Sequence, residues 1–157
     1  MRTKGDRVLE AILWTAALVL LCSVGAGCRA EVDAIFYTSD GQVPAETITK
    51  ACQIWFPVGL QCELGVDGNT NVAITGYRHA AYAGETDPWH GEPIRVRIDL
   101  DYTNGAAYVA HEFGHCLGLI HDNSGPALMN ASITDEAVLT DIDKKQYYDL
   151  HPGAPKF

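Results

Sequence analysis

The sequence predicts a small α+β domain built on a twisted mixed sheet. Three observations support this prediction: segments in which apolar and polar residues alternate, segments in which apolar residues recur at helical spacing, and the order of these segments along the chain. That order is strand, helix, several strands, helix, irregular segment and helix. The chain has 157 residues, which is enough for one domain with a hydrophobic core but not for two.

The first 27 residues differ from the rest, and we exclude them from the fold. "MRTKGDR" is basic and "AILWTAALVLLCSVGAG" is uncharged, a combination that is typical of an export signal. "VGAGC", which ends at Cys28, resembles a bacterial lipobox, in which the cysteine becomes lipidated. Lipidation of Cys28, ordinary cleavage and retention as a short membrane anchor stay open as alternatives. Each of them places the domain outside the cytoplasm.

Cysteine usage and net charge also bear on the compartment and the partners. Cys52 and Cys62 are the natural pair for a disulfide in an oxidising compartment, with two free buried thiols as the alternative. The formal charge of −9 argues against nucleic acid and anionic membrane surfaces as partners. We therefore expect a monomer that contacts a membrane only through an N-terminal lipid or anchor.

The first half of the domain begins with a strand and a helix. Residues 31–39 alternate and are rich in β-forming residues, which predicts a strand. Residues 43–59 follow as a helix that starts near Pro44 and ends at Pro57. Its apolar stripe consists of Ile48, Cys52 and Trp55.

Three further strands and two helices complete the domain. Strands are expected over 60–66 and 71–79, and residues 81–93 are expected to form a loop. Residues 94–102 alternate regularly and predict a half-exposed strand, with arginines and aspartates on its outer face. Helices are expected over 103–119, with Ala106, Val109, Phe113 and Cys116 facing the sheet, and over 139–151, where Thr140 and Asp143 form a capping-box-like pair.

The stretch "HEFGHCLGLIH", which starts at His111, carries the predicted chemistry. His111 and His115 are four residues apart, so on a helix both imidazoles lie on one face and can share one ion. Gly118 can end the helix in a left-handed conformation, which lets His121 turn back as the third ligand. Three protein ligands and one water are the arrangement of catalytic zinc. Glu112 is rotated off the ligand pair and can reach that water as a general base.

An accidental match is the alternative to a zinc site. H-E-x-x-H alone fixes only three positions, and many helices contain it by chance. Here five positions are fixed, and ordinary residue usage predicts such a match at about one start in a million. The sequence therefore predicts one catalytic zinc ion.

The same stretch resembles the extended zinc motif H-E-x-x-H-x-x-G-x-x-H of the metzincin metalloproteases. "AYVAHEFGHCLGLIHDNSGPALMN" is similar to the matrixin (matrix metalloprotease-like) branch, in which an A-L-M turn soon follows the third histidine. The resemblance implies a zincin-like catalytic domain over 31–157, with Met129 as a hydrophobic base beneath the histidines. "LTDIDKKQYYDLHPG" resembles the closing helix of the family. Cys116 stands where a small apolar residue is common, so we expect it to be buried.

The resemblance implies a zinc-dependent endopeptidase that acts on proteins or peptides. A water activated by zinc would attack the peptide carbonyl, and Glu112 would take the proton and pass it to the leaving amine. We expect strand 94–102 to guide an extended peptide by β-augmentation, and segment 130–140 to form the wall of the S1′ pocket. Two other functions stay open: a zincin-like binding module at the cell surface that does not hydrolyse, and a metal carrier, which would have no use for Glu112.

Some features depart from the family or give weaker signals. No propeptide with a latency cysteine is visible before the domain, and Ala131 stands where some metzincins, though not the matrixins, carry a tyrosine that assists catalysis. His79, Asp87 and His90 lie in the region where matrixins bind structural metals. Their spacing does not match that pattern, so a second metal is an alternative that we do not favour. His151 is expected to be exposed.

Overall fold

Five strands form one mixed sheet in the part of the chain that the structure describes. The computed structural model describes residues 34–66, 68–78, 83–87, 93–102 and 105–156. The strand order across the sheet is β2-β1-β3-β5-β4, in which β4 is antiparallel to β5 and all other neighbours are parallel. The strands are β1 (Ala34–Ser39), β2 (Gln61–Leu64), β3 (Val72–Tyr77), β4 (Gly84–Asp87) and β5 (Ile94–Asp99). The predicted α+β class with a mixed sheet is thus confirmed.

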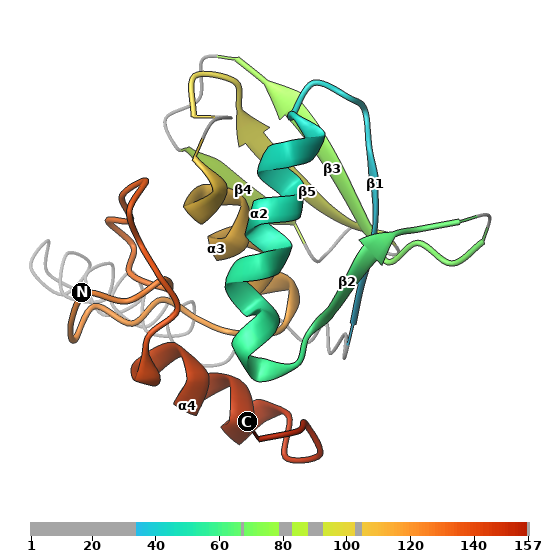
Figure 1. Cartoon of the computed structure of the whole chain (residues 1–157). Helices are drawn as coiled ribbons and strands as arrows, with labels where there is room; N and C mark the ends of the chain where they lie inside the picture. Colours follow the sequence, from blue (N-terminus) through green and yellow to red (C-terminus); the bar gives the residue numbers. More distant parts are fainter. Residues whose placement is uncertain (1–33, 67, 79–82, 88–92, 103–104, 157) are drawn as a thin grey trace, which may run out of the picture.

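Two helices lie side by side against the sheet, and a third lies below them (Figure 1). They are α2 (Ala45–Trp55), which continues into the short helix η1 (Phe56–Val58), α3 (Ala106–Cys116) and α4 (Asp141–Leu150). The indole Nε1 of Trp55 donates a hydrogen bond of 2.8 Å to the carbonyl of Ala110 and so fixes α2 against α3. Both side chains are fully buried in the core that the sheet and these helices share. This packing makes α3 the central helix of the domain.

The elements are shorter than the sequence pattern predicted. The first helix ends at Trp55, because Pro57 lies in the tighter η1 turn and Gly59 closes that turn at a φ of 76°. The strand expected over 94–102 ends at Asp99. Asp99 was expected on the exposed face, but it is only 2% exposed. The alternation stops there because the chain turns out of the sheet, with the amide of Tyr102 donating to the carbonyl of Asp99 at 2.8 Å.

The segment expected as a loop over 81–93 contains the edge strand β4. Its register with β5 pairs Glu85 with Arg97 and Thr86 with Val96. Strand β5 therefore lies between β3 and β4 and has no free edge in the described sheet, so the expectation that this strand pairs with an extended peptide by β-augmentation is wrong. The sequence of β4, "GETD", has no alternation of apolar residues, because its inner face contacts a polar side chain of α3 rather than the core.

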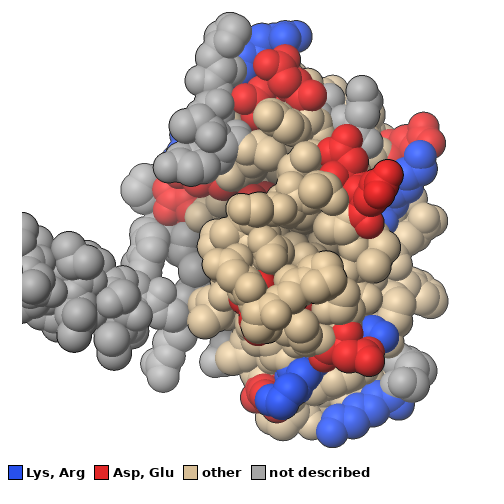
Figure 2. All heavy atoms as spheres, turned by 90° about the vertical axis from the view of Figure 1, so that its left-hand side faces the viewer, with Lys and Arg blue, Asp and Glu red and all other residues tan. Residues whose placement is uncertain are grey.

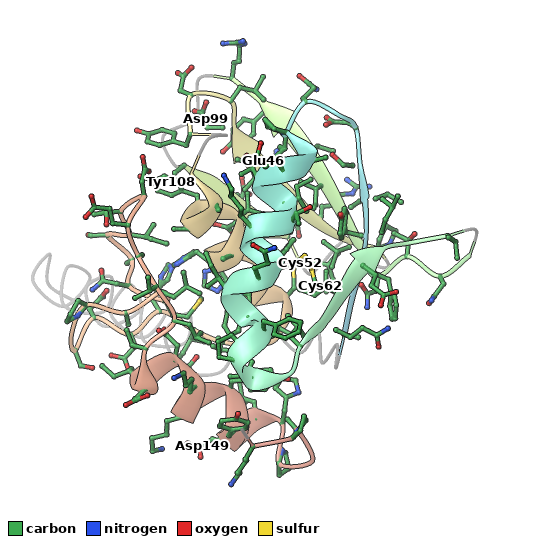
Figure 3. All side chains as sticks on the ribbon, viewed as in Figure 1. Glu46, Cys52, Cys62, Asp99, Tyr108 and Asp149 are labelled. Carbon is green, nitrogen blue, oxygen red and sulfur yellow. A yellow bond between two sulfur atoms is a disulfide. The ribbon has the colours of Figure 1, made fainter. Side chains whose placement is uncertain are left out.

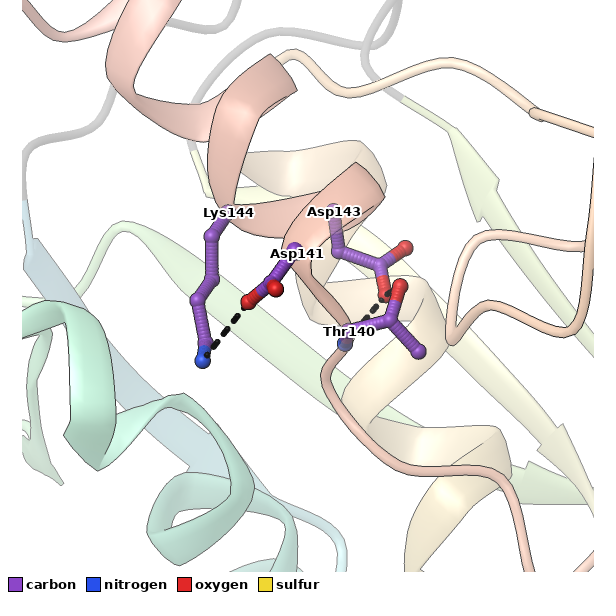
Figure 4. A network of polar contacts seen from close by, with 4 residues as sticks. All are labelled: Thr140, Asp141, Asp143 and Lys144. Atoms are coloured by element: carbon purple, nitrogen blue, oxygen red, sulfur yellow. Dashed lines mark hydrogen bonds and ion pairs between the residues drawn. The ribbon is translucent and has the colours of Figure 1, made fainter.

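The capping pair predicted at the start of α4 is confirmed. The backbone amide and the hydroxyl of Thr140 each donate a hydrogen bond of 2.8 Å to the carboxylate of Asp143. Figure 4 shows this contact beside the exposed ion pair of Asp141 and Lys144, which are 3.4 Å apart. Asp143 is only 1% exposed, so its carboxylate is an internal part of the fold.

The predicted disulfide between Cys52 and Cys62 is also confirmed. It joins α2 to β2, with Cα atoms 5.6 Å apart (Figure 3). Within the described ranges, no helix has the length and apolar character needed to cross a bilayer.

His151 is buried, contrary to the expectation from the sequence. It is 6% exposed, its ring stacks on Tyr147 with centroids 4.7 Å apart, and its Nε2 lies 2.9 Å from the carbonyl of Leu117. The physical reason is that the chain beyond α4 folds back onto the end of α3. The sequence pattern could not indicate this, because the carbonyl that His151 contacts is a backbone group.

Candidate metal centre

Two histidines of the site come from one face of α3. The spacing of four residues places the rings of His111 and His115 one turn apart, with their centroids at 4.8 Å. The face is determined by the apolar residues of α3 that pack on the sheet and on α2, including Val109 and Phe113, both fully buried. His111 is 5% exposed and His115 is half-buried. The predicted pair is therefore held by the core of the domain.

Gly118 brings the third histidine back to this face. Its φ of 86° is left-handed, and the amides around it close the end of α3 in the way that is typical of such helix ends. The amide of Gly118 donates to the carbonyl of His115 at 3.0 Å, and that of Leu119 donates to Gly114 at 2.9 Å. The chain then reverses, and His121 lies beside the other two rings as predicted.

The three Nε2 atoms converge on one point. Nε2 of His121 lies 3.1 Å from Nε2 of His111 and 3.2 Å from Nε2 of His115. Nε2 of His111 and Nε2 of His115 each keep a lone pair (below), so they can coordinate a cation placed between the three rings. The three side chains can therefore hold a metal ion, and they are the only cluster of this kind among the residues that the structure describes.

Backbone carbonyls orient the first two histidines. Nδ1 of His111 lies 2.7 Å from the carbonyl of Leu128, and Nδ1 of His115 lies 2.9 Å from that of Leu119. Because a carbonyl oxygen only accepts, each Nδ1 carries the proton and each Nε2 keeps its lone pair. Burial lowers the pKa of His111 to about 4 and lowers the pKa of the other two imidazoles as well. At neutral pH all three are thus in the neutral form that binds metals.

Met129 packs against α3 at Gly114, which lies between the two helical histidines in the sequence. It is fully buried, and a Cβ added at Gly114 would lie only 2.2 Å from its sulfur. A side chain at position 114, between the two helical histidines, would therefore displace the side chain of Met129. Asp143 fixes this turn, because its carboxylate accepts hydrogen bonds of 2.9 Å from the amides of both Leu128 and Met129.

Glu112 is buried beside the histidines and is not one of the converging ligands. It is 5% exposed, and burial raises the pKa of its carboxyl to about 7. The hydroxyl of Thr86 opposes this shift by donating a hydrogen bond of 2.6 Å to Oε2. A metal ion held by the histidines would also lower this pKa, since a nearby positive charge favours the carboxylate.

The site opens into a hollow of about 550 Å³ between β4 and the segment after Met129. Tyr108 forms part of its wall near the start of α3 (Figure 3). Burial and a hydrogen bond to Asp135 raise the pKa of Tyr108 to about 12. Among the described residues, those that line the hollow include no lysine or arginine; they are Ala83, Gly84, Glu85, Thr86, Tyr102, Tyr108, His111, Glu112, His115, His121, Ala131, Ser132 and Ile133.

The other sequence-based candidates fall in different places. Cys116 is fully buried, as expected. Asp87 lies at the end of β4, whereas His79 and His90 are outside the described residues, as are the export signal and Cys28. The sequence therefore remains the only basis for the interpretation of those four features.

Sequence reasoning missed several groups that complete the site. These are the orienting carbonyls of Leu119 and Leu128, the hydroxyl of Thr86 and the carboxylate of Asp143. The carbonyls have no sequence signal at all. The sequence indicated Asp143 only as a helix-capping residue. Capping accounts for half of the hydrogen bonds that its carboxylate accepts.

Comparison of the sequence with protein-family models finds no match, and comparison with curated proteins finds none either. The interpretation of this site therefore depends on its own geometry and chemistry.

Proposed function

We propose that the protein is a zinc-dependent endopeptidase with a small zincin-like fold, similar to the matrixin branch of the metzincins. The observation that carries the proposal is the convergence of three neutral imidazoles beside a buried carboxylate, in a hollow open to solvent. A carrier would need the three imidazoles, but it would gain nothing from a buried carboxylate next to them.

The donor set fits zinc. Neutral imidazoles are preferred zinc ligands, and around a tetrahedral zinc ion two such nitrogens lie about 3.3 Å apart. The distances of 3.1 and 3.2 Å to Nε2 of His121 agree with this value. Three protein ligands leave one position open for a water, as in catalytic sites. When bound, zinc would supply a Lewis acid that lowers the pKa of that water and polarises the peptide carbonyl.

Glu112 would act as the general base. Glu112 lines the hollow together with the histidines, and its carboxylate would take a proton from the attacking water. The same oxygen can then deliver that proton to the leaving amine. Burial raises the pKa of the carboxyl and so makes it a stronger base, whereas a cation on the histidines would lower this pKa again.

The substrate would be an extended peptide chain paired with β4. Within the described part of the sheet, β4 pairs on one side only, with β5. Its free edge borders the hollow through Ala83, Gly84 and Glu85, so backbone pairing would bring a peptide bond to the histidines. Ala131, Ser132 and Ile133 also line the hollow and would form the wall of the S1′ pocket.

The site of action would be outside the cytoplasm. The disulfide between Cys52 and Cys62 is typical of oxidising compartments, and the basic and apolar segments before Cys28 resemble an export signal. A lipid on Cys28 would attach the domain to a membrane. If it does, replacing Cys28 by serine should release the protein from membranes and alter its processing.

Peptide hydrolysis with and without a chelator tests the proposal. The zinc-loaded protein should cleave members of a broad peptide library, and the chelator should abolish cleavage until zinc is restored. Glu112→Gln keeps the shape of the side chain but cannot take up a proton. It should still bind about one zinc ion while hydrolysis falls roughly 10²–10⁴-fold. A parent protein that binds zinc and cleaves no peptide would instead support a non-catalytic binding module.

A further inference from the structure

Two residues of the edge strand β4 enclose the side chain of Glu112. The hydroxyl of Thr86 donates to Oε2 of Glu112 at 2.6 Å and lies 3.1 Å from the carbonyl oxygen of the same residue. Gly84 lies two residues earlier, on the same face of the strand. A Cβ added there would be 2.6 Å from Oε1 and 2.8 Å from Cγ of Glu112. The carboxylate therefore occupies the space that a side chain at position 84 would fill.

This arrangement restricts Glu112 in two different ways. The glutamate side chain has three rotatable torsions, and burial alone does not select one direction for its carboxylate. The hydrogen bond from Thr86 holds Oε2 toward β4, and the bare backbone of Gly84 leaves room for Oε1 beside it. Since Gly84, Thr86 and Glu112 all line the hollow, the carboxylate is held at the boundary between the helix and the space where a substrate would lie.

We propose that Thr86 is a positioning residue for Glu112 and that Gly84 provides the space this position requires. The inference rests on the proposed function, in which Glu112 is the base. It means that the strand expected to pair with the substrate also sets the geometry of the base, so peptide and base are aligned by one element. Proton transfer depends on distances at the scale of an ångström. Holding the carboxylate of Glu112 in place should therefore raise kcat rather than strengthen substrate binding.

The alternative is that Thr86 only helps to pack β4 against α3. Its second contact, with the backbone carbonyl of Glu112, would suffice for that. The two roles differ in their effect on catalysis. A packing role should alter stability, whereas a positioning role should alter kcat and should depend on the carboxylate of Glu112.

The experiment compares Thr86→Val with Thr86→Ser in the zinc-loaded protein. Valine keeps the shape of threonine and removes the hydroxyl, so kcat should fall roughly ten- to a hundredfold, the loss expected for a hydrogen bond to a charged group. KM and zinc affinity should change little, and serine should restore most of kcat. Thr75→Val on β3 is the matched control: its hydroxyl is 3.5 Å from the carbonyl of Val96 and outside the hollow, so its kcat should equal that of the parent.

Two further variants connect the effect to Glu112. Gly84→Ala should lower kcat with zinc affinity retained, because the new Cβ would displace the carboxylate. In a double-mutant cycle, Thr86→Val should cause no further loss in the Glu112→Gln background.

The outcomes separate the inference from the proposed function. Parent-like kcat in Thr86→Val, or an equal further loss in the Glu112→Gln background, would overturn the positioning role while the protease assignment stands. A parent that cleaves nothing would overturn both.

Discussion

Asp143 links the last helix to the first histidine of the site through two backbone amides. It accepts hydrogen bonds from Leu128 and Met129, and the carbonyl of Leu128 in turn orients His111. Because the carboxylate is buried and acts only as an acceptor, each of its oxygens has a defined partner. The position of one imidazole therefore depends on a residue that lies 32 positions further along the chain.

Replacing Asp143 by asparagine should weaken both the fold and the metal centre. Asparagine has a single carbonyl oxygen, so its NH₂ group would face the amide of Leu128 or Met129 without an acceptor. The free energy of unfolding should fall by about 1–3 kcal/mol, and metal affinity should fall roughly 10–100-fold, as for other groups that orient ligands. Urea denaturation and competition with a chromogenic chelator measure the two effects.

Asp141→Asn is the matched control on the same helix. The carboxylate of Asp141 is fully exposed and pairs only loosely with Lys144, at 3.4 Å. Its replacement should change stability by no more than about 0.5 kcal/mol. Equal effects of the two variants would contradict the role assigned to Asp143.

Replacing His115 by alanine should remove metal binding rather than weaken it slightly. Loss of a group that merely orients a ligand costs roughly 10–100-fold in affinity, so loss of a ligand itself should cost at least as much. Chelator competition should find no tight site, and hydrolysis should disappear with it. A His115→Ala protein that keeps stoichiometric metal would mean that the converging histidines are not the ligands.

At this scale the sequence predicted the three histidines that lie together but not the groups that orient them. The spacing of His111, His115 and His121 predicted the cluster because the side chains of these residues form it. The carbonyls of Leu119 and Leu128 belong to the backbone, which is the same at every position, so no residue type could have indicated them. Thr86 is polar and could have been noted, but nothing in "GETD" connects it with Glu112.

The end of α3 determines where the third ligand lies. Gly118 has a φ of 86°, a conformation that costs a residue with a Cβ about 1 kcal/mol or more. Gly118→Ala should lower stability by about that amount. It should also lower metal affinity, because the reversal that brings His121 to the other rings would shift.

Gly41→Ala separates these two effects. Gly41 has a similar φ of 80°, and a Cβ there would contact nothing within 4 Å. It should lose about the same stability as Gly118→Ala and keep the metal affinity of the parent. If both alanine variants bind metal like the parent, the turn at Gly118 does not control His121.

The disulfide between α2 and β2 should contribute to stability without affecting the site. It closes a loop with a sequence separation of 10, for which the loss of chain entropy in the unfolded state amounts to about 2–3 kcal/mol. Replacing both Cys52 and Cys62 by alanine should lower the free energy of unfolding by that amount. Metal affinity and kcat should not change, because neither cysteine lines the hollow. A loss of metal in this variant would show that the two regions are coupled.

At the scale of elements, the sequence predicted those that bury an apolar face. The periodic residues of α3 and the alternation in β5 gave both elements, because each packs one face into the core. Strand β4 was missed because its inner face contacts Glu112 and its outer face is solvated, so neither face is apolar. The consequence was an error about the edge of the sheet, and hence about which strand is free to pair with a peptide.

The whole molecule brings four separate segments to one place. Four elements each supply a side chain or backbone group that belongs to the histidine site or contacts it. They are strand β4, helix α3, the turn at Met129 and the start of α4. The face in Figure 2 has charged side chains around a broad centre of other residues, in which a few acidic atoms are visible. Motif spacing predicted the contribution of α3 and Met129. The contributions of β4 and α4 arise from long-range contacts, which a single sequence does not specify.

Metal binding should be coupled to a proton on Glu112. In the metal-free protein, burial raises the pKa of this carboxyl from 4.5 to about 7, whereas it lowers the pKa of His111 from 6.5 to about 4. The raised carboxyl pKa stabilises the metal-free fold fully below pH 4.5, and this stabilisation is lost as pH rises to 7. The histidine has the opposite sign: its contribution is complete above pH 6.5 and is lost as pH falls toward 4. At pH 6, therefore, Glu112 is mostly protonated and His111 is neutral.

A cation beside Glu112 lowers the pKa of the carboxyl, so binding at pH 6 should release its proton. Calorimetry in buffers of different ionisation enthalpy counts the protons released when zinc binds. The parent should release about one proton more than Glu112→Gln at pH 6, and the difference should vanish at pH 8, where the carboxyl is already ionised in the metal-free protein. Taking the difference between the two proteins removes any protons released by His115 and His121, because both proteins keep these residues. Equal proton release by the two proteins at pH 6 would mean that Glu112 is ionised before the metal arrives.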